Sequence, residues 1–276
     1  MIQHETQPPR WLRWAQITWV AIVVAALLMY VAGSVLHFSQ LRQVCTATAE
    51  QCAEFDQATT IGLAQLDALG ISLEAYALFL VGFRVVFSLV PIALGLLIFA
   101  RRRNEPISLL VSLFLITWPT AGEAMGLLAT AYPAFQIPAE IIKLTATISL
   151  PLFFGTFPNG RMVPRLYWVV VAYFGVYFVL STLGLISSDS PLGSFWSWTG
   201  WLSVLLGGVA AQIYRYRRVS NPTEQQQTRW VLFGMGAIPL FLVGAFAYMG
   251  ITGDTTVGTT ADPFLLRRFT FLAVSA

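Results

Sequence analysis

The chain has 276 residues and a formal net charge of +3 at pH 7; 57% of the residues are hydrophobic and 11% are charged. An average soluble domain has about 45–50% apolar and about 25% charged residues, so this composition excludes an ordinary soluble globular protein. The basic excess does not indicate a nucleic-acid-binding protein, because the arginines are divided among separate connectors without a continuous basic stripe.

Apolar residues gather into eight runs, most of them about twenty residues or longer. At 1.5 Å per residue, a helix of that length crosses a hydrocarbon core of about 30 Å. The sequence therefore predicts an all-α integral membrane protein with about eight transmembrane helices. The eighth run is shorter than the roughly 17–25 residues that a spanning helix needs, so we expect it to be truncated. In chain order the runs are Ala15–Leu36, Leu73–Ala100, Ile107–Ala131, Ala139–Phe157, Tyr167–Ile186, Phe195–Tyr214, Trp230–Ile251 and Pro263–Ala276.

The basic residues predict the orientation of these helices, because Lys and Arg are enriched in cytoplasmic connectors. With the N-terminus inside, eleven of the sixteen basic residues are cytoplasmic. We therefore expect a multi-pass protein of the bacterial inner (cell) membrane, with a cytoplasmic tail at 1–14 and a polytopic domain at 15–276. Besides Arg10 and Arg13 in the tail, the inner-face residues are Arg101, Arg102, Arg103, Arg161, Arg165, Arg215, Arg217, Arg218 and Arg229.

The segment 38–72 is predicted to be an extracytoplasmic loop, and it contains both cysteines, Cys45 and Cys52. An even pair of cysteines in a short loop outside the cytoplasm is typical of a structural disulfide. A redox-sensing or metal-binding pair is the alternative, but His37 is the only nearby histidine and two thiols alone make a poor zinc site. After the cysteines, Ile61–Ile71 has apolar residues at helical spacing, which predicts a short helix lying on the membrane.

Ionisable residues within the predicted spans are candidates for a signal or ligand pocket, because charges are costly in lipid. Arg84, in the second helix, is expected near the midplane of the membrane, with its side chain reaching toward Glu123 in the third helix. Glu140 and Lys143 lie one turn apart, a spacing that allows an ion pair. Pro119 interrupts the hydrogen-bond ladder beside Glu123. The alternative is structural: an interhelical ion pair of Arg84 with Glu123, and Glu140 with Lys143 in the headgroup layer.

No catalytic pattern is present in the sequence. An HExxH motif, a GxSxG motif and a glycine-rich phosphate loop are all missing, and the chain has only two histidines. We therefore predict no enzyme activity for this chain, no cofactor and no metal site.

The predicted inner connectors contain turn signals. Pro158, Asn159 and Gly160 favour a tight turn, because proline presets φ and glycine accepts a positive φ. This turn returns Arg161 and Arg165 to the inner leaflet and keeps the fourth and fifth helices close. Such an elbow is suited to transmit helix movement to a cytoplasmic partner, or it only anchors the topology.

Three segments of the predicted connectors are distinctive: GLLIFARRRNEPISLLVSLFLITW at Gly95–Trp118, FPNGRMVPR at Phe157–Arg165 and YRYRRVSNPTEQQQTRWVLFG at Tyr214–Gly234. Together they resemble the N-terminal multi-pass membrane sensor region of bacterial sensor histidine kinases. The cysteine loop followed by LDALGIS is also similar. Gln225 departs from the family, which usually has Arg there.

The resemblance implies the signal-input module of a two-component-type sensor histidine kinase, without the catalytic domain. The partners would be the lipid bilayer and, in a full-length parent, a cytoplasmic kinase domain or a second copy of the chain. Two alternatives remain open. One is a small-molecule or ion transporter, with Arg84, Glu123 and Lys143 as coupling residues, and the other is a non-enzymatic membrane anchoring protein.

Overall fold

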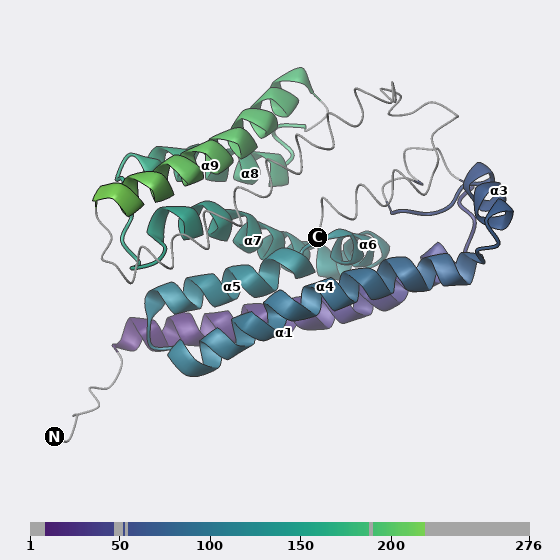
Figure 1. Cartoon of the computed structure of the whole chain (residues 1–276), viewed down its shortest axis with the longest axis horizontal. Helices are drawn as coiled ribbons and strands as arrows, with labels where there is room; N and C mark the ends of the chain where they lie inside the picture. The colour runs from purple at the N-terminus through teal and green to yellow at the C-terminus, as the bar shows by residue number, and fades with distance from the viewer. Residues whose placement is uncertain (1–8, 47–51, 53–54, 188–189, 219–276) are drawn as a thin grey trace. The chain divides into compact units, whose positions relative to one another are not determined.

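The computed structural model describes residues 9–46, 52, 55–187 and 190–218, and all regular elements in these ranges are helices. The chain divides into two compact units. The first, which we call the helical unit, comprises Met1–Gly33 and Ser88–Thr228; the second, the disulfide lobe, comprises Ser34–Phe87 and Arg229–Ala276. The helices α1 (Arg10–Leu41) and α4 (Leu73–Arg102) contribute to both units. Both helices are labelled in Figure 1.

The remaining helices of the helical unit follow α4 in chain order. They are α5 (Pro106–Thr120), α6 (Glu123–Ala131), the 3-10 helix η1 (Pro133–Phe135), α7 (Gln136–Thr156), α8 (Tyr167–Thr182) and α9 (Pro191–Arg218). Within this unit α7 packs against α5, α8 and α9, and α8 packs against α9, as Figure 1 shows. The helix α7 is therefore the central element of the group α5–α9.

One apolar core of the helical unit joins α1, α4 and α5. Trp19 of α1 stacks on Phe99 of α4 with 3.6 Å between ring centroids, and its indole N–H donates to Ser112 Oγ of α5 at 2.9 Å. A buried indole needs a hydrogen-bond partner for its N–H. The stacking on Phe99 buries the apolar ring, and Ser112 accepts the N–H. The buried core residues are Leu12, Trp19, Val23, Ile92, Leu109 and Ile116.

The third predicted span, Ile107–Ala131, is broken into α5 and α6, which meet at an angle of 66°. Pro119 has no N–H to donate to the preceding turn, as the sequence predicted, and Gly122 starts the new helix. Thr117 and Thr120 donate their hydroxyls back to the carbonyls of Leu113 and Ile116 at 2.8 Å each, which favours bending.

The described residues contain three helices that are long and apolar enough to cross a membrane, or four if α5 and α6 form one broken span. The predictions Ala15–Leu36, Leu73–Ala100 and Ala139–Phe157 correspond to α1, α4 and α7. The predicted count of eight is not supported. The helix α8 has only 16 residues, and α9 is long but interrupted by Ser, Thr and Gly residues that lower its hydropathy. The runs Trp230–Ile251 and Pro263–Ala276 lie outside the described residues.

The disulfide lobe contains the end of α1, the helix α3 (Thr60–Ala68) and the start of α4. The helix predicted at Ile61–Ile71 is thus confirmed, with shorter bounds. Thr59 caps its first turn through Oγ1, which accepts from the Gly62 N–H at 3.2 Å. At its other end Gly70 has φ +69°, and the N–H of Ile71 returns to the Leu66 carbonyl at 2.9 Å, a Schellman motif.

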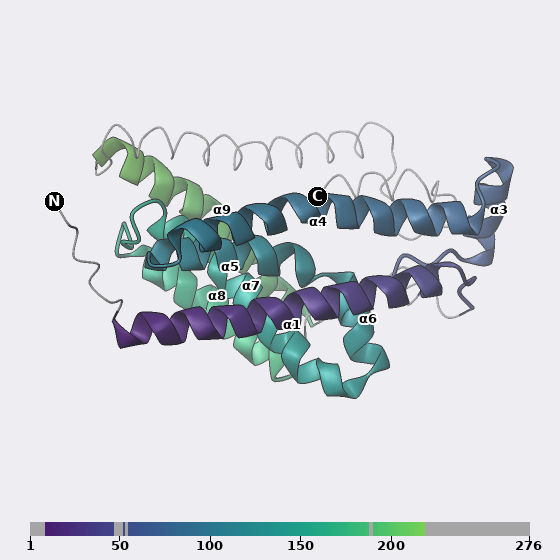
Figure 2. The ribbon, with the colours of Figure 1, turned by 90° about the horizontal axis from the view of Figure 1, so that it is seen from below.

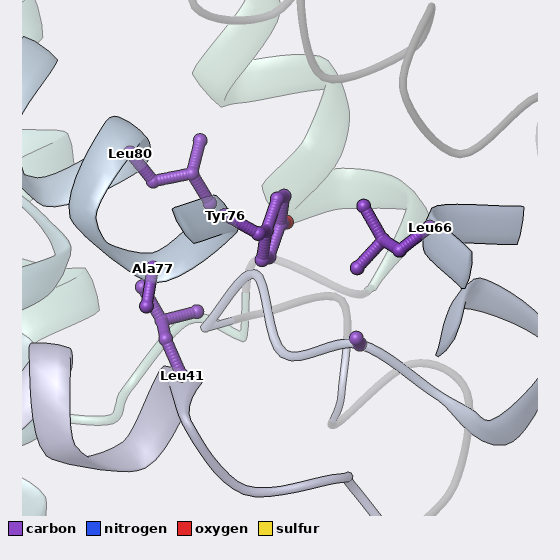
Figure 3. Close-up of a cluster of buried hydrophobic side chains, with 6 residues drawn as sticks. Leu41, Leu66, Tyr76, Ala77 and Leu80 are labelled. Atoms are coloured by element: carbon purple, nitrogen blue, oxygen red, sulfur yellow. The ribbon is translucent and has the colours of Figure 1, made fainter. Parts of the chain in front are cut away.

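The lobe has a small apolar core of its own (Figure 3). Figure 3 shows Leu66 of α3 facing Tyr76 of α4, with Leu41 of α1 below Ala77. The buried members are Leu41, Ala58, Leu66, Tyr76, Ala77 and Leu80.

Substitution of Gly33 tests the packing of α1 against the start of α6. A Cβ at Gly33 would lie 2.2 Å from the Ala124 carbonyl oxygen, so backbone must move. We expect Gly33→Ala to lower the free energy of unfolding by about 1–3 kcal/mol, the usual cost of overpacking. Thermal unfolding in detergent measures this. The control is Gly126→Ala in α6, where nothing lies within 4 Å, and it should be neutral or slightly stabilising. Equal stability of the two variants would contradict the close approach.

Candidate functional site

The cysteine pair of the lobe forms the predicted disulfide. Cys45 and Cys52 are joined with an S–S distance of 2.05 Å. Backbone hydrogen bonds extend this closure to the next residues, because the Cys45 N–H donates to the Ala58 carbonyl at 2.8 Å and the Gln57 N–H donates to the Cys52 carbonyl at 2.9 Å. The disulfide therefore lies at the base of a segment, residues 55–58, that passes between α1 and α4.

Side chains of α1 bind this segment from one side. His37 is 1% exposed, and its Nε2 lies 2.9 Å from the Phe55 carbonyl oxygen. Gln40 and Gln57 contact each other twice: the Gln57 amide donates to the Gln40 carbonyl at 2.8 Å, and the Gln40 amide donates to Gln57 Oε1 at 3.2 Å. The last turns of α1 thus contact the segment through polar groups.

Asp56 is the residue of this segment that α4 binds. Arg84 Nη2 donates to Asp56 Oδ2 at 2.6 Å, and the two side chains are 22% and 3% exposed. The Tyr76 hydroxyl donates to the Asp56 carbonyl at 3.0 Å. Asp56 has φ +58°, a left-handed conformation in which Asp and Asn are enriched among non-glycine residues. One acidic residue in an uncommon backbone conformation is thereby bound at both its side chain and its carbonyl by α4.

The structure places the other predicted pocket residues in the helical unit. Glu140 and Lys143 form the predicted ion pair, 3.0 Å long, with side chains 41% and 47% exposed. A pair this open to its surroundings contributes about 1 kcal/mol or less. Glu123 lies in the first turn of α6, where the helix dipole favours a negative charge. Arg84 belongs to the disulfide lobe, so a pocket shared by all four residues remains a prediction.

The end of α7 is capped by α9, and we call this contact the arginine latch. It consists of Gln212 and Arg215 of α9, both 0% exposed, bound to the turn that follows α7. The Gln212 amide donates to the carbonyl of Phe154 at 2.7 Å and to that of Phe157 at 3.3 Å. The Arg215 guanidinium donates to the carbonyls of Gly155 at 2.9 Å and Thr156 at 3.1 Å. Four consecutive carbonyls at the C-terminus of α7 thus accept from one face of α9.

The same guanidinium binds the turn itself. Arg215 donates to Asn159 Oδ1 at 2.8 Å and to the Arg161 carbonyl. Gly160 has φ +76°, as the turn signal predicted, and Asn159 Oδ1 also accepts the Arg161 N–H at 3.2 Å. These acceptors are neutral groups, and the partial negative charge at the C-terminus of α7 offsets the buried positive charge.

The arginine latch was missed by the sequence analysis, which treated Arg215 only as an inner-face connector. The available signal was the spacing of Gln212 and Arg215, three residues apart and therefore on one face of a helix. The latch joins two of the segments that carried the resemblance, Phe157–Arg165 and Tyr214–Gly234, within the part of each that the structure describes.

The predicted inner-face arginines gather at one end of the helical unit. The Gln16 amide of α1 donates to the Arg103 carbonyl at 2.8 Å, and a Cβ at Gly160 would lie 3.6 Å from Ile107 of α5. With the latch, these contacts bring the start of α1, the α4–α5 connector, the α7–α8 turn and the end of α9 together. Figure 2 shows these four segments at the end of the unit where α1 begins. Arg229 lies outside the described residues.

Comparisons with protein-family models, with curated proteins and with solved structures give no match to this chain. The resemblance to sensor histidine kinases accordingly stays a prediction.

Substitution of Asp56 tests the attachment of the lobe segment to α4. Asp56→Asn keeps a side chain that tolerates a positive φ but removes the charge opposite Arg84. We expect the free energy of unfolding to fall by about 2 kcal/mol, less than for a fully buried pair because Arg84 is partly exposed. Glu74→Gln is the matched control, since the Arg42–Glu74 pair is 3.5 Å long and its side chains are 52% and 67% exposed. Denaturant titration in detergent should show little change in the free energy of unfolding for Glu74→Gln. Equal losses for Asp56→Asn and Glu74→Gln would contradict a stabilising role of the Asp56–Arg84 pair.

Substitution of Arg215 tests the arginine latch. Arg215→Met retains a long apolar stem but removes the donors to three carbonyls and Asn159. We expect destabilisation of about 3 kcal/mol, because buried acceptors lose charged hydrogen-bond partners. Arg217→Met, two residues further along the same helix, removes an exposed arginine and should cost no more than about 0.5 kcal/mol. Similar melting temperatures for the two variants would show that the latch contributes nothing.

Proposed function

We propose that this chain is the membrane-embedded signal-input module of a sensor histidine kinase. The observation that carries the proposal is the ion pair of Asp56 with Arg84. It ties a disulfide-closed segment to α4, a helix of 30 residues that is long and apolar enough to cross a membrane. A change in the lobe segment would therefore act on a spanning helix without an intermediate element.

The composition of the two units supports this direction of signalling. A disulfide is typical of oxidising compartments, so we assign the lobe to the extracytoplasmic side of a bacterial cell membrane. Arginines are enriched on the cytoplasmic side, so we assign the arginine-rich end of the helical unit to the cytoplasm. In this multi-pass arrangement the latch fixes the end of α9 on the side that we assign to the cytoplasm.

The first test is the reading frame downstream of codon 276. The proposal expects it to continue into a helical hairpin with a phosphoacceptor histidine and an ATP-binding domain. A stop codon there, together with the absence of a co-purifying kinase, would contradict the proposal.

The second test uses the full-length protein in vesicles. We expect Asp56→Asn to change autophosphorylation by about fivefold or more, the effect of a coupling free energy near 1 kcal/mol. Glu74→Gln, which removes an exposed charge from the same helix, should leave the rate unchanged. If the folded Asp56→Asn variant autophosphorylates at the wild-type rate, the Asp56–Arg84 pair has no role in signalling.

Transport is a second candidate, favoured by the break between α5 and α6. Discontinuous helices with a charged residue at the break recur at transporter ion and substrate sites. Glu123 lies at this break, in the first turn of α6. For a proton- or cation-coupled transporter, Glu123→Gln should abolish flux into proteoliposomes while Glu140→Gln leaves it intact. Absence of flux under every imposed gradient would remove this candidate.

A further inference from the structure

The exposed arginines of the helical unit form a group that we call the arginine collar. All its members are exposed, in contrast to Arg215, and they come from the four segments that the latch and the Gln16–Arg103 contact bring together. The members are Arg10, Arg13, Arg101, Arg102, Arg103, Arg161, Arg165, Arg217 and Arg218.

The collar has a strong excess of positive charge. Among the described residues at this end of the unit, Glu105 is the acidic one, and it forms a 2.8 Å ion pair with Arg102. The hydrogen bond from Arg102 lowers the pKa of Glu105 below its ordinary value, against an opposing effect of partial burial. Glu105 is therefore ionised at neutral pH, and it offsets one arginine of the nine.

Large apolar side chains lie exposed among these arginines. Trp11 and Trp14 of α1 are 57% and 69% exposed, Trp168 of α8 is 52% exposed, and Leu166 before it is 76% exposed. Tryptophan is enriched at the headgroup level of membranes, where an apolar ring and a polar N–H both find partners. Exposed indoles between arginines are thus typical of a bilayer interface.

The apolar surface continues from the collar along α1. Ile17, Val24, Leu28 and Val31 follow Trp14 at spacings of three, seven, four and three residues, and each is at least half exposed. These intervals return to one face of a helix. An acidic soluble protein would match the arginines but not the apolar stripe that continues from them along α1. An anionic lipid matches both, because its headgroup can bind the arginines and its acyl chains can contact the stripe.

We propose that the arginine collar binds anionic phospholipid headgroups, with the acyl chains along the exposed stripe of α1. The inference does not depend on the proposed function, because a sensor and a transporter would both allow it. Each arginine near an anionic membrane surface adds to the attraction, so several arginines on one rim favour anionic over zwitterionic lipid.

The arginine latch organises part of this surface. Arg215 binds the turn that carries Arg161 and Arg165, and it is two and three residues before Arg217 and Arg218 on α9. One buried cation thus positions four exposed cations from two separate segments. The side chains of these four are exposed, so an experiment can replace them together without removing a described core contact.

The test uses the full chain reconstituted in phosphatidylcholine vesicles with trace spin-labelled lipid. Electron spin resonance compares the fractions of labelled phosphatidylglycerol and labelled phosphatidylcholine that are immobilised at the protein. We expect phosphatidylglycerol to associate several-fold more strongly at low salt. The preference should fall toward equality near 1 M NaCl, where the Debye length is about 3 Å.

Two matched variants decide the role of the collar. Replacement of Arg161, Arg165, Arg217 and Arg218 by Gln should remove at least half of the preference, and replacement of the same four by Lys should retain it. Lys143→Gln, in the N-terminal half of α7 and away from the collar, should leave the preference unchanged. Melting temperatures close to wild type establish that each variant is folded.

Three results would overturn the proposal. The first is equal association of the two lipids with the wild type, which is expected if an acidic soluble protein is the true partner of the collar. The second is an unchanged preference in the folded Gln variant. The third is the same loss in the Lys and Gln variants, because charge would then not be the cause.

Discussion

The C-terminus of α7 depends on hydrogen-bond donors that the turn after it supplies only in part, and the rest come from α9. The last four carbonyls of a helix have no partner within the helix, and such groups are costly where water is excluded. Gly155 and Thr156 receive backbone N–H groups from the following turn, but Phe154 and Phe157 receive the amide of Gln212, and Arg215 donates to the two carbonyls between them. Because α7 packs against α5, α8 and α9, this cap stabilises the place in the helical unit where α7 and α9 end and α8 begins.

The disulfide lobe also contains irregular backbone whose polar groups need partners, and there the arginine involved is Arg84. Its segment 55–58 crosses between two helices, so its backbone groups cannot pair as they would in a helix or sheet. His37 contacts the Phe55 carbonyl, Tyr76 donates to that of Asp56, and the Cys45 N–H donates to that of Ala58. Arg84 then binds the Asp56 side chain rather than a carbonyl. In both places an arginine from a long helix stabilises irregular backbone beside it.

The parts of the fold that the sequence predicted are those that follow from local composition. The helices α1, α4 and α7 are continuous apolar runs, and α3 has helical spacing and a glycine at its end, so each could be found without knowing its neighbours. The pairing of Cys45 with Cys52 and of Glu140 with Lys143 likewise followed from short separations in sequence.

The parts that the sequence did not predict depend on contacts between distant residues. The sequence indicated the bend at Pro119 to Gly122 only through the backbone hydrogen bond that Pro119 cannot form. The hydropathy of Ile107–Ala131 is that of one continuous span, so it did not indicate two helices. Asp56 lay within the predicted extracytoplasmic loop 38–72 and was not singled out, because nothing local shows that Arg84, 28 residues later, would bind it. Arg215 was treated as a marker of membrane side, a rule that does not distinguish exposed from buried arginines.

The length of α4 bears on where Arg84 lies in a membrane. Thirty residues correspond to about 45 Å of helix, well beyond a hydrocarbon core of about 30 Å. The segment that contains Asp56 has irregular backbone, which membranes tolerate only where protein or water surrounds it. The first turns of α4, up to Arg84, belong with the lobe, and the helix from Arg84 to Arg102 is about 27 Å long, close to the thickness of a hydrocarbon core. A bilayer crossed by α4 would therefore have Arg84 at its edge rather than at its midplane, because the Asp56 carboxylate that binds Arg84 then stays outside lipid.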